Sequence, residues 1–166
     1  MKASTLSLLL KWPLIALLAV SALALADPQP VPADTAGTAP EPLAITVYKS
    51  PSCGCCGDWA IHLEQHGFQV TPVNLADLSS VKTRLGVPQQ LRSCHTAVIG
   101  DFVIEGHVPA EDIKTLVAQR NGYGLAVPGM PVGSPGMEMG DRKDAFDVIA
   151  FDRDGGTSKV KEYRDY

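Results

Sequence analysis

The chain has 166 residues, with 14 Lys or Arg against 18 Asp or Glu, a formal net charge of −4, and four cysteines. This acidic balance contains no basic run, which argues against a nucleic acid or an anionic membrane surface as partner. The length allows one domain with a sizeable core, and no internal repeat is evident.

Residues 1–26 have the features of a secretory signal peptide. Lys2 and Lys11 supply positive charge, residues 12–25 are apolar, and residues 24–26 form a small-x-small cleavage site. A membrane anchor is the weaker alternative, because the apolar run is short, contains a proline and leads into polar sequence. We therefore predict an exported, soluble periplasmic protein with no membrane association after cleavage.

Residues 27–42 carry five prolines among small and polar residues, with almost no apolar periodicity. This composition is typical of a disordered linker. Residues 43–166 are predicted to form one folded domain.

Apolar periodicity within this domain predicts alternating strands and helices. We expect strands at 43–48, 68–75, 96–99 and 102–104, and helices at 55–66, 77–85 and 109–119. A Gly/Pro-rich loop at 122–140 and a β-hairpin with strands at 148–152 and 159–163 follow. The order of the first seven elements resembles the thioredoxin fold, so the predicted class is α/β and thioredoxin-like.

Cys53, Cys55 and Cys56 lie between the first predicted strand and its helix. A helix N-terminus favours thiolate over thiol, and the thiolate is the form that reacts and binds metals. These three cysteines are therefore expected to be reactive. In thioredoxin-like folds the segment before the third strand lies against the redox cysteines and usually presents a cis proline. Here that proline is absent, and the resemblance implies that Cys94 faces the cluster.

Disulfides, zinc and copper are the chemistries that these cysteines suit. Structural disulfides usually join distant segments, whereas three of these sulfurs share one turn. Adjacent Cys55 and Cys56 converge poorly on one tetrahedral zinc. Cu(I) prefers thiolates, one sulfur can bridge two ions, and equal numbers of Cu(I) and thiolate are neutral. We therefore favour a multinuclear Cu(I) cluster on Cys53, Cys55, Cys56 and Cys94.

The metal-free oxidised form is a separate question, because four cysteines allow three pairings. A bond between the neighbours Cys55 and Cys56 would close a strained ring. We predict the pairs Cys53–Cys56 and Cys55–Cys94.

Four further side chains are candidate copper ligands. His107 lies before the third predicted helix, in a loop that borders the active site of thioredoxin-like folds, and a surface loop histidine is the competing interpretation. Met130, Met137 and Met139 lie in the Gly/Pro-rich loop. Their thioethers suit Cu(I), although they could equally cover apolar surface.

The other histidines are expected to have structural roles. His95 follows Cys94 directly, and strand alternation predicts that it faces away from that sulfur. His62 lies about two helical turns after Cys55, roughly 10 Å along the axis. His62 and His66 form an i, i+4 pair that we interpret as a solvated helix face rather than a metal site.

Four motifs in order resemble the CopG-type copper-resistance proteins, an exported bacterial family long known only as a metal-binding domain of unknown function. They span residues 47–59, 93–98, 105–110, and 127–131 with 133–138. The resemblance implies a thioredoxin-like fold whose cysteines, here Cys53, Cys55, Cys56 and Cys94, hold a multinuclear copper cluster. It also implies periplasmic copper tolerance, with other copper-handling proteins as partners.

The sequence thus predicts a periplasmic Cu(I)-binding protein for copper resistance and homeostasis, whose loading depends on the redox state of its cysteines. The main alternative is a thiol–disulfide oxidoreductase that uses Cys53 and Cys56, with Cys53 as the attacking thiolate. An interaction module with inert disulfides is a third interpretation.

Overall fold

A computed structural model of the protein describes residues 41–166. The predicted signal peptide and all but the last two residues of the predicted linker lie outside this range. Within the described range, no helix is long and apolar enough to cross a membrane.

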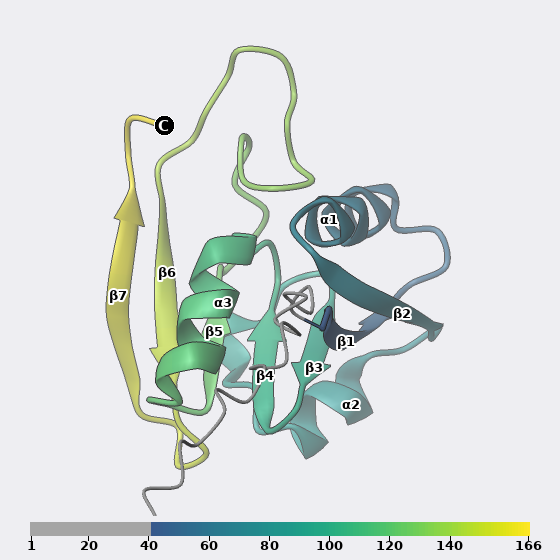
Figure 1. The fold of residues 1–166 in the computed structure, drawn as a ribbon, viewed down its shortest axis with the longest axis vertical. Coiled ribbons are helices and arrows are strands. Elements are labelled where there is room, and N and C mark those ends of the chain that lie inside the picture. Colours follow the sequence, from purple (N-terminus) through teal and green to yellow (C-terminus); the bar gives the residue numbers. More distant parts are fainter. Residues whose placement is uncertain (1–40) are drawn as a thin grey trace, which may run out of the picture. The chain divides into compact units, whose positions relative to one another are not determined.

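The described chain alternates strands and helices and ends in a β-hairpin (Figure 1). The helices are α1 (Gly54–Gln65), α2 (Ser79–Arg84), the 3-10 helix η1 (Gln89–Leu91) and α3 (Ala110–Gln119). The strands are β1 (Leu43–Lys49), β2 (Phe68–Asn74), β3 (Thr96–Ile99), β4 (Phe102–Glu105), β5 (Gly124–Ala126), β6 (Phe146–Phe151) and β7 (Thr157–Tyr163).

All seven strands form one mixed sheet in the order β2-β1-β3-β4-β5-β6-β7. β1 is parallel to β2, β4 is parallel to β5, and the other neighbours are antiparallel. Because β1 and β3 run in opposite directions, with Tyr48 opposite Thr96, the end of β1 lies beside the start of β3. The end of β4 lies there too, since Thr96 also pairs with Glu105. Three connecting segments therefore meet at one end of the sheet.

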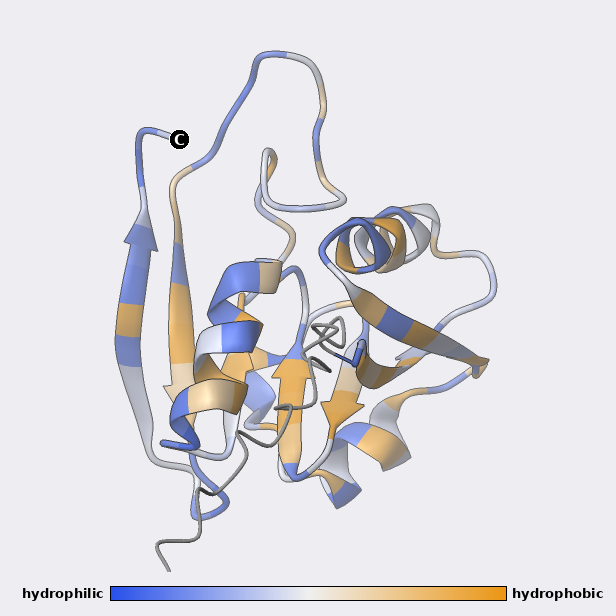
Figure 2. Cartoon of the chain, in the orientation of Figure 1, coloured by the Kyte–Doolittle hydropathy of each residue, from blue (hydrophilic) through white to orange (hydrophobic). Residues whose placement is uncertain are grey.

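The two faces of the sheet carry separate hydrophobic clusters. Trp59 and Leu63 of α1 and Ile113 and Leu116 of α3 pack on one face. The turn after α2, η1 and Phe151 pack on the other. Alternation along β4 divides its residues between the two clusters. Figure 2 shows the corresponding concentration of hydrophobic residues on β3 and β4, with β7 largely hydrophilic.

The predicted α/β class and the C-terminal hairpin are confirmed, and the first predicted strands and helices occur in the expected order. One strand was not predicted: β5 lies at the start of the stretch interpreted as a loop. Its three residues are too few for a periodic signal. Gly124 within it permits close packing, because an added Cβ would lie 2.5 Å from the Val103 carbonyl oxygen. Pairing with β4 and β6 on both sides makes it a strand.

Candidate metal centre

The turn after β1 delivers three cysteines to the N-terminus of α1. The N–H of Cys53 donates to the carbonyl of Ser50 at 3.2 Å, and Cys53 occupies the N-cap position of the helix. Cys53 and Cys56 form a disulfide, as predicted. Cys56 is fully buried, whereas Cys53 and Cys55 are partly exposed. One turn thus presents both a disulfide and a thiol.

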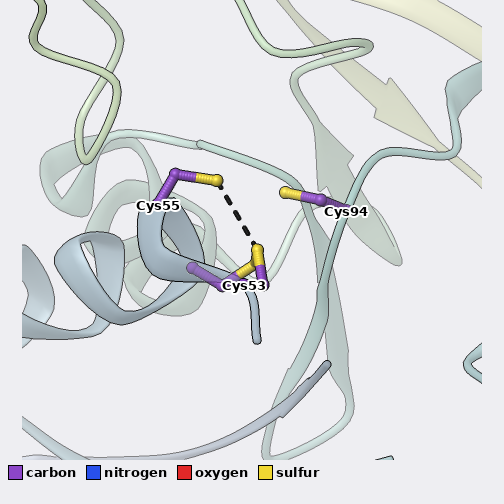
Figure 3. A group of neighbouring side chains, drawn as sticks. Cys53, Cys55 and Cys94 are labelled. Carbon is purple, nitrogen blue, oxygen red and sulfur yellow. Dashed lines mark hydrogen bonds between the residues drawn. A yellow bond between two sulfur atoms is a disulfide. The ribbon is translucent and has the colours of Figure 1, made fainter. Parts of the chain in front are cut away.

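Cys94 completes a group of four sulfurs. The Sγ atoms of Cys53, Cys55, Cys56 and Cys94 all lie within 4.8 Å of one another. Figure 3 shows the sulfur of Cys94 directed toward those of Cys53 and Cys55. Cys55 and Cys94 are free thiols, so the predicted second disulfide is not formed. The Cys55 thiol instead donates toward the Cys53 sulfur at 3.5 Å, since a disulfide sulfur has no proton to give.

A buried ion pair holds the segment that carries Cys94. One carboxylate oxygen of Glu105 accepts from Lys82 and from the Ser93 N–H, both at 2.5 Å. The other accepts from the Thr96 hydroxyl at 2.6 Å, which itself accepts from Lys82 at 2.8 Å. The side chains of Glu105 and Lys82 are only 0% and 8% exposed. Glu105 therefore binds the residues on both sides of the Cys94–His95 pair.

His107 faces the same sulfur from the loop after β4. Its Nε2 lies 3.3 Å from Cys94 Sγ, and its Nδ1 lies 2.8 Å from the Pro135 carbonyl oxygen. A carbonyl can only accept, so Nδ1 carries the proton and Nε2 of the neutral ring presents a lone pair to Cys94. Burial lowers the pKa of His107, which favours this neutral form.

The thiol of Cys94 is itself partly shielded from water. Burial, and next the neighbouring Cys55 sulfur, raise the pKa of Cys94 to about 11. In the absence of metal this group is therefore a protonated thiol at neutral pH. A bound cation would have to displace that proton, as metal binding to thiols generally does.

The prediction that His95 faces away from Cys94 is wrong. Its Nδ1 lies 3.3 Å from the Cys94 sulfur, because both residues precede β3 and strand alternation does not apply to them. The His95 ring packs against Trp59, with centroids 4.3 Å apart, and edge-on against His107 at 4.9 Å. Its Nε2 is the one buried side-chain N or O atom within residues 41–166 that has no hydrogen-bond partner. Burial lowers the pKa of His95 well below its ordinary value.

The Gly/Pro-rich loop contacts α1 through Gly136. This glycine has φ +79°, and an added Cβ would lie 2.5 Å from the Trp59 nitrogen and 2.8 Å from the Cys55 carbonyl oxygen. Only glycine permits this approach, which places the adjacent Pro135 carbonyl against His107. The loop is therefore part of the structure that orients the histidine.

The three methionines of the Gly/Pro-rich loop differ in their exposure to solvent. Met130 and Met139 are 53% and 65% exposed, and Met137 is partly buried. Their participation as copper ligands stays a prediction.

His62 has a role that sequence analysis missed. Its Nε2 accepts from the backbone N–H of Ala110, the first residue of α3, at 3.2 Å. His66 Nδ1 bonds the His62 carbonyl at 2.7 Å. The pair is thus not a plain solvated helix face: one ring caps a neighbouring helix. The indole of Trp59 adds a second link, donating to the Val108 carbonyl at 2.9 Å.

Other contributors to the site were also missed, for a physical reason. Glu105 ends an apolar strand, which is a weak local signal, but nothing in the sequence connects it with Lys82. The role of Pro135 lies in its backbone carbonyl, which every residue has. These contributions exist only once distant segments pack together.

The chain has relatives of known structure. Residues 91–137 match the family described as "Protein of unknown function, DUF411". A solved structure named copper resistance protein CopG, form 2, shares 56% identity with a TM-score of 0.72, covering 75% of this chain and 100% of its own. Form 1 shares 57% identity with a TM-score of 0.71, covering 74% and 98%. The chain belongs to the CopG family of copper resistance proteins.

CopG membership and the four-sulfur group together support a copper-related role for the chain. No curated protein matches it. The DUF411 match spans the segments that carry Cys94, His107 and the first part of the Gly/Pro-rich loop. The predicted resemblance is therefore confirmed at the level of the family.

Proposed function

We propose that the protein binds Cu(I) as a multinuclear, thiolate-bridged cluster on Cys53, Cys55, Cys56 and Cys94, and serves copper resistance and homeostasis. The carrying observation is that all four sulfurs lie within 4.8 Å of one another. Cu(I) is soft and prefers thiolates, and a thiolate can bridge two ions. The CopG relatives, which are named for copper resistance, support copper as the cargo.

His107 is proposed as an additional ligand. Its Nε2 lone pair faces Cys94, and its other nitrogen is held by a carbonyl, as is common for metal-binding histidines. Met130, Met137 and Met139 are proposed to assist copper entry, because they lie on the loop that packs against α1 and two of them are exposed.

Redox state is proposed to control the copper capacity. The Cys53–Cys56 disulfide occupies two of the four sulfurs, so reduction must precede cluster formation. This requirement links the loading of the protein to the thiol–disulfide balance of its compartment.

The location of the protein and its partners are proposed from the sequence. We propose periplasmic export directed by residues 1–26, with residues 27–42 as a linker before the domain, and exchange of copper with other copper-handling proteins. We also propose that β1 to β4 with α1 to α3 form a thioredoxin-like unit. The order β2-β1-β3-β4, with cysteines at the β1–α1 junction, supports it.

An anaerobic Cu(I) titration of the fully reduced protein against a competing chelator tests the cluster. We expect more than two tightly held ions per chain, lost when Cys55 or Cys94 is replaced by serine. One ion or none in the reduced protein would contradict the cluster.

Thiol–disulfide exchange is a second candidate function, favoured by the disulfide at the N-terminus of α1. Cys53 is the partly exposed member of the pair and Cys56 the buried one, so Cys53 would react with a partner. An insulin-reduction assay tests this function: activity abolished in C53S would support it, and absence of activity in the wild-type protein would exclude it.

A further inference from the structure

The disulfide leaves three soft or borderline donors unused. The thiols of Cys55 and Cys94 are free, their sulfurs lie within 4.8 Å of each other, and His107 Nε2 lies 3.3 Å from Cys94. The three groups come from α1, from the segment before β3 and from the loop after β4. Of the two bonded sulfurs, that of Cys53 lies 3.5 Å from Cys55 Sγ.

We propose that the disulfide form, in which Cys53 and Cys56 are bonded, still binds copper. It holds a single Cu(I) on Cys55, Cys94 and His107. The inference rests on the proposed copper-binding function and deepens it. Two thiolates and one imidazole suit Cu(I), which accepts soft sulfur together with nitrogen donors. When a partner disulfide accepts two electrons from the Cys53 and Cys56 thiolates, those thiolates form the disulfide and the partner becomes a dithiol. The copper content then falls to one ion, and the other Cu(I) ions leave the site.

The donors are held in place independently of copper. Glu105 fixes the backbone on both sides of Cys94 through Ser93 and Thr96. The carbonyl of Pro135 fixes the proton of His107 on Nδ1, which leaves Nε2 free to bind. Cys55 lies on the first turn of α1, which Gly136 contacts closely. Little rearrangement is needed for binding, which favours affinity.

His95 is the competing nitrogen donor, since its Nδ1 also lies 3.3 Å from Cys94. Binding copper through Nδ1 would place the ring proton on Nε2, which is buried and has no acceptor. An N–H buried without a partner is unfavourable, because it loses its hydrogen bonds to water and gains none in the protein. His107 binds through Nε2 without that cost, because its Nδ1–H is already satisfied. His95 Nδ1–H instead donates to the Cys94 sulfur.

The net charge of the proposed site agrees with His107 as the copper ligand and His95 as a hydrogen-bond donor. Two thiolates and one Cu(I) carry one net negative charge in a partly buried position. The Nδ1–H of His95 stabilises it by a hydrogen bond to the Cys94 thiolate. The same His95 N–H would stabilise the multinuclear copper cluster once the Cys53–Cys56 disulfide is reduced. His95 therefore need not move between the one-copper and the cluster state.

The test uses protein prepared with the Cys53–Cys56 disulfide intact and two free thiols per chain, verified by alkylation and mass mapping before and after the titration. Under anaerobic conditions with a competing chelator, we expect one Cu(I) per chain. C55S and C94S should bind none, and X-ray absorption should report two sulfur neighbours and one nitrogen. The C53S/C56S double variant, which lacks both disulfide sulfurs and keeps the proposed donors, should bind one ion in oxidising and in reducing buffer.

Substitutions of the histidines decide the nitrogen ligand. H107Q should weaken Cu(I) binding of the disulfide form by roughly tenfold or more, H95Q by less, and H66Q, outside the site, not at all. A larger loss in H95Q than in H107Q would overturn the assignment to His107. No copper in the disulfide form, with more than two ions in the reduced form, would overturn the mononuclear site alone. One ion or none in the reduced form would instead overturn the cluster.

Discussion

The two sides of the metal centre are built in different ways. On the α1 side, three cysteines fall within four residues, and a single turn and helix start bring them together. On the Cys94 side, one cysteine depends on an ion pair between α2 and β4, and on a loop carbonyl that orients His107. The first side is local and partly exposed, whereas the second is tertiary and mostly buried. Mutations far from the sulfurs should therefore affect the second side.

The largest effect is expected for E105Q, which leaves Lys82 charged and unpaired in a buried position. Removing one partner of a buried pair costs about 3–5 kcal/mol. We expect a loss of that order in urea unfolding. The Cu(I) count should also fall, because the amide of E105Q keeps only one accepting oxygen in place of the two that now accept from Ser93 and Thr96. The double variant K82M/E105Q removes the orphaned charge and should regain part of the stability. Equal copper counts in E105Q and wild type would show that the ion pair does not position Cys94.

A smaller effect is expected for G136A, which places a Cβ against the backbone of α1. Positive φ alone costs a residue other than glycine about 1–2 kcal/mol, and the steric clash adds to it. G140A is the matched control, because Gly140 also has positive φ (+62°) but no atom within 4 Å of an added Cβ. We expect G136A to be the less stable variant by thermal unfolding and to bind Cu(I) more weakly. Equal melting temperatures would mean that the loop can move away from α1 freely.

Acid should destabilise the protein through His62. Burial, then the charge of His66, lower the pKa of His62 from its ordinary value of 6.5, while Glu138 and Glu111 oppose this. The unfolded chain therefore binds the proton more tightly, so this stabilisation is complete above about pH 6.5 and is lost as pH falls below it. Buried His95 and His107 act in the same direction.

The variant H62Q can keep an acceptor for the Ala110 N–H but does not titrate. Between about pH 7.5 and about pH 5.5 its melting temperature should fall less than that of wild type. H66Q, which removes the histidine at the C-cap of the same helix, should retain most of the wild-type slope. A cap of this kind contributes about 1 kcal/mol, so H62A should lose that much at neutral pH. Parallel slopes for H62Q and wild type would contradict the role of His62.

The smallest effect is expected at the opposite edge of the sheet. Lys161 on β7 pairs with Asp112 of α3 at 2.8 Å, and its side chain is 47% exposed. Ion pairs at the surface contribute between 0 and about 1 kcal/mol. Asp112 is only 11% exposed, but Tyr163, which donates to it at 2.6 Å in the wild type, would still satisfy its carboxylate in K161A. K161A should therefore change urea stability by less than about 1 kcal/mol and leave the Cu(I) count unchanged. A copper defect in K161A would show that the metal centre depends on more than the contacts around Cys94.

Prediction from sequence succeeded where the signal is local. Apolar periodicity gave the α/β class and the terminal hairpin, and the spacing of Cys53 and Cys56 gave their disulfide. It failed at β5, which is strand only because β4 and β6 lie beside it. It also failed at His95, because strand alternation was applied to two residues that precede the strand, and at the second disulfide, which is absent.

The sequence by itself determined the family, the four thiols and the cysteine-rich turn, because motif order and residue spacing are properties of the chain. Only the tertiary structure decided which groups surround Cys94. Glu105, Lys82 and Pro135 are distant from it in sequence, and antiparallel pairing of β1, β3 and β4 brings the segments bearing the cysteines and His107 to one end of the sheet. The chemistry of the Cys94 thiol depends on its burial and on the hydrogen-bond partners of the residues around it. Both arise only when the chain is packed.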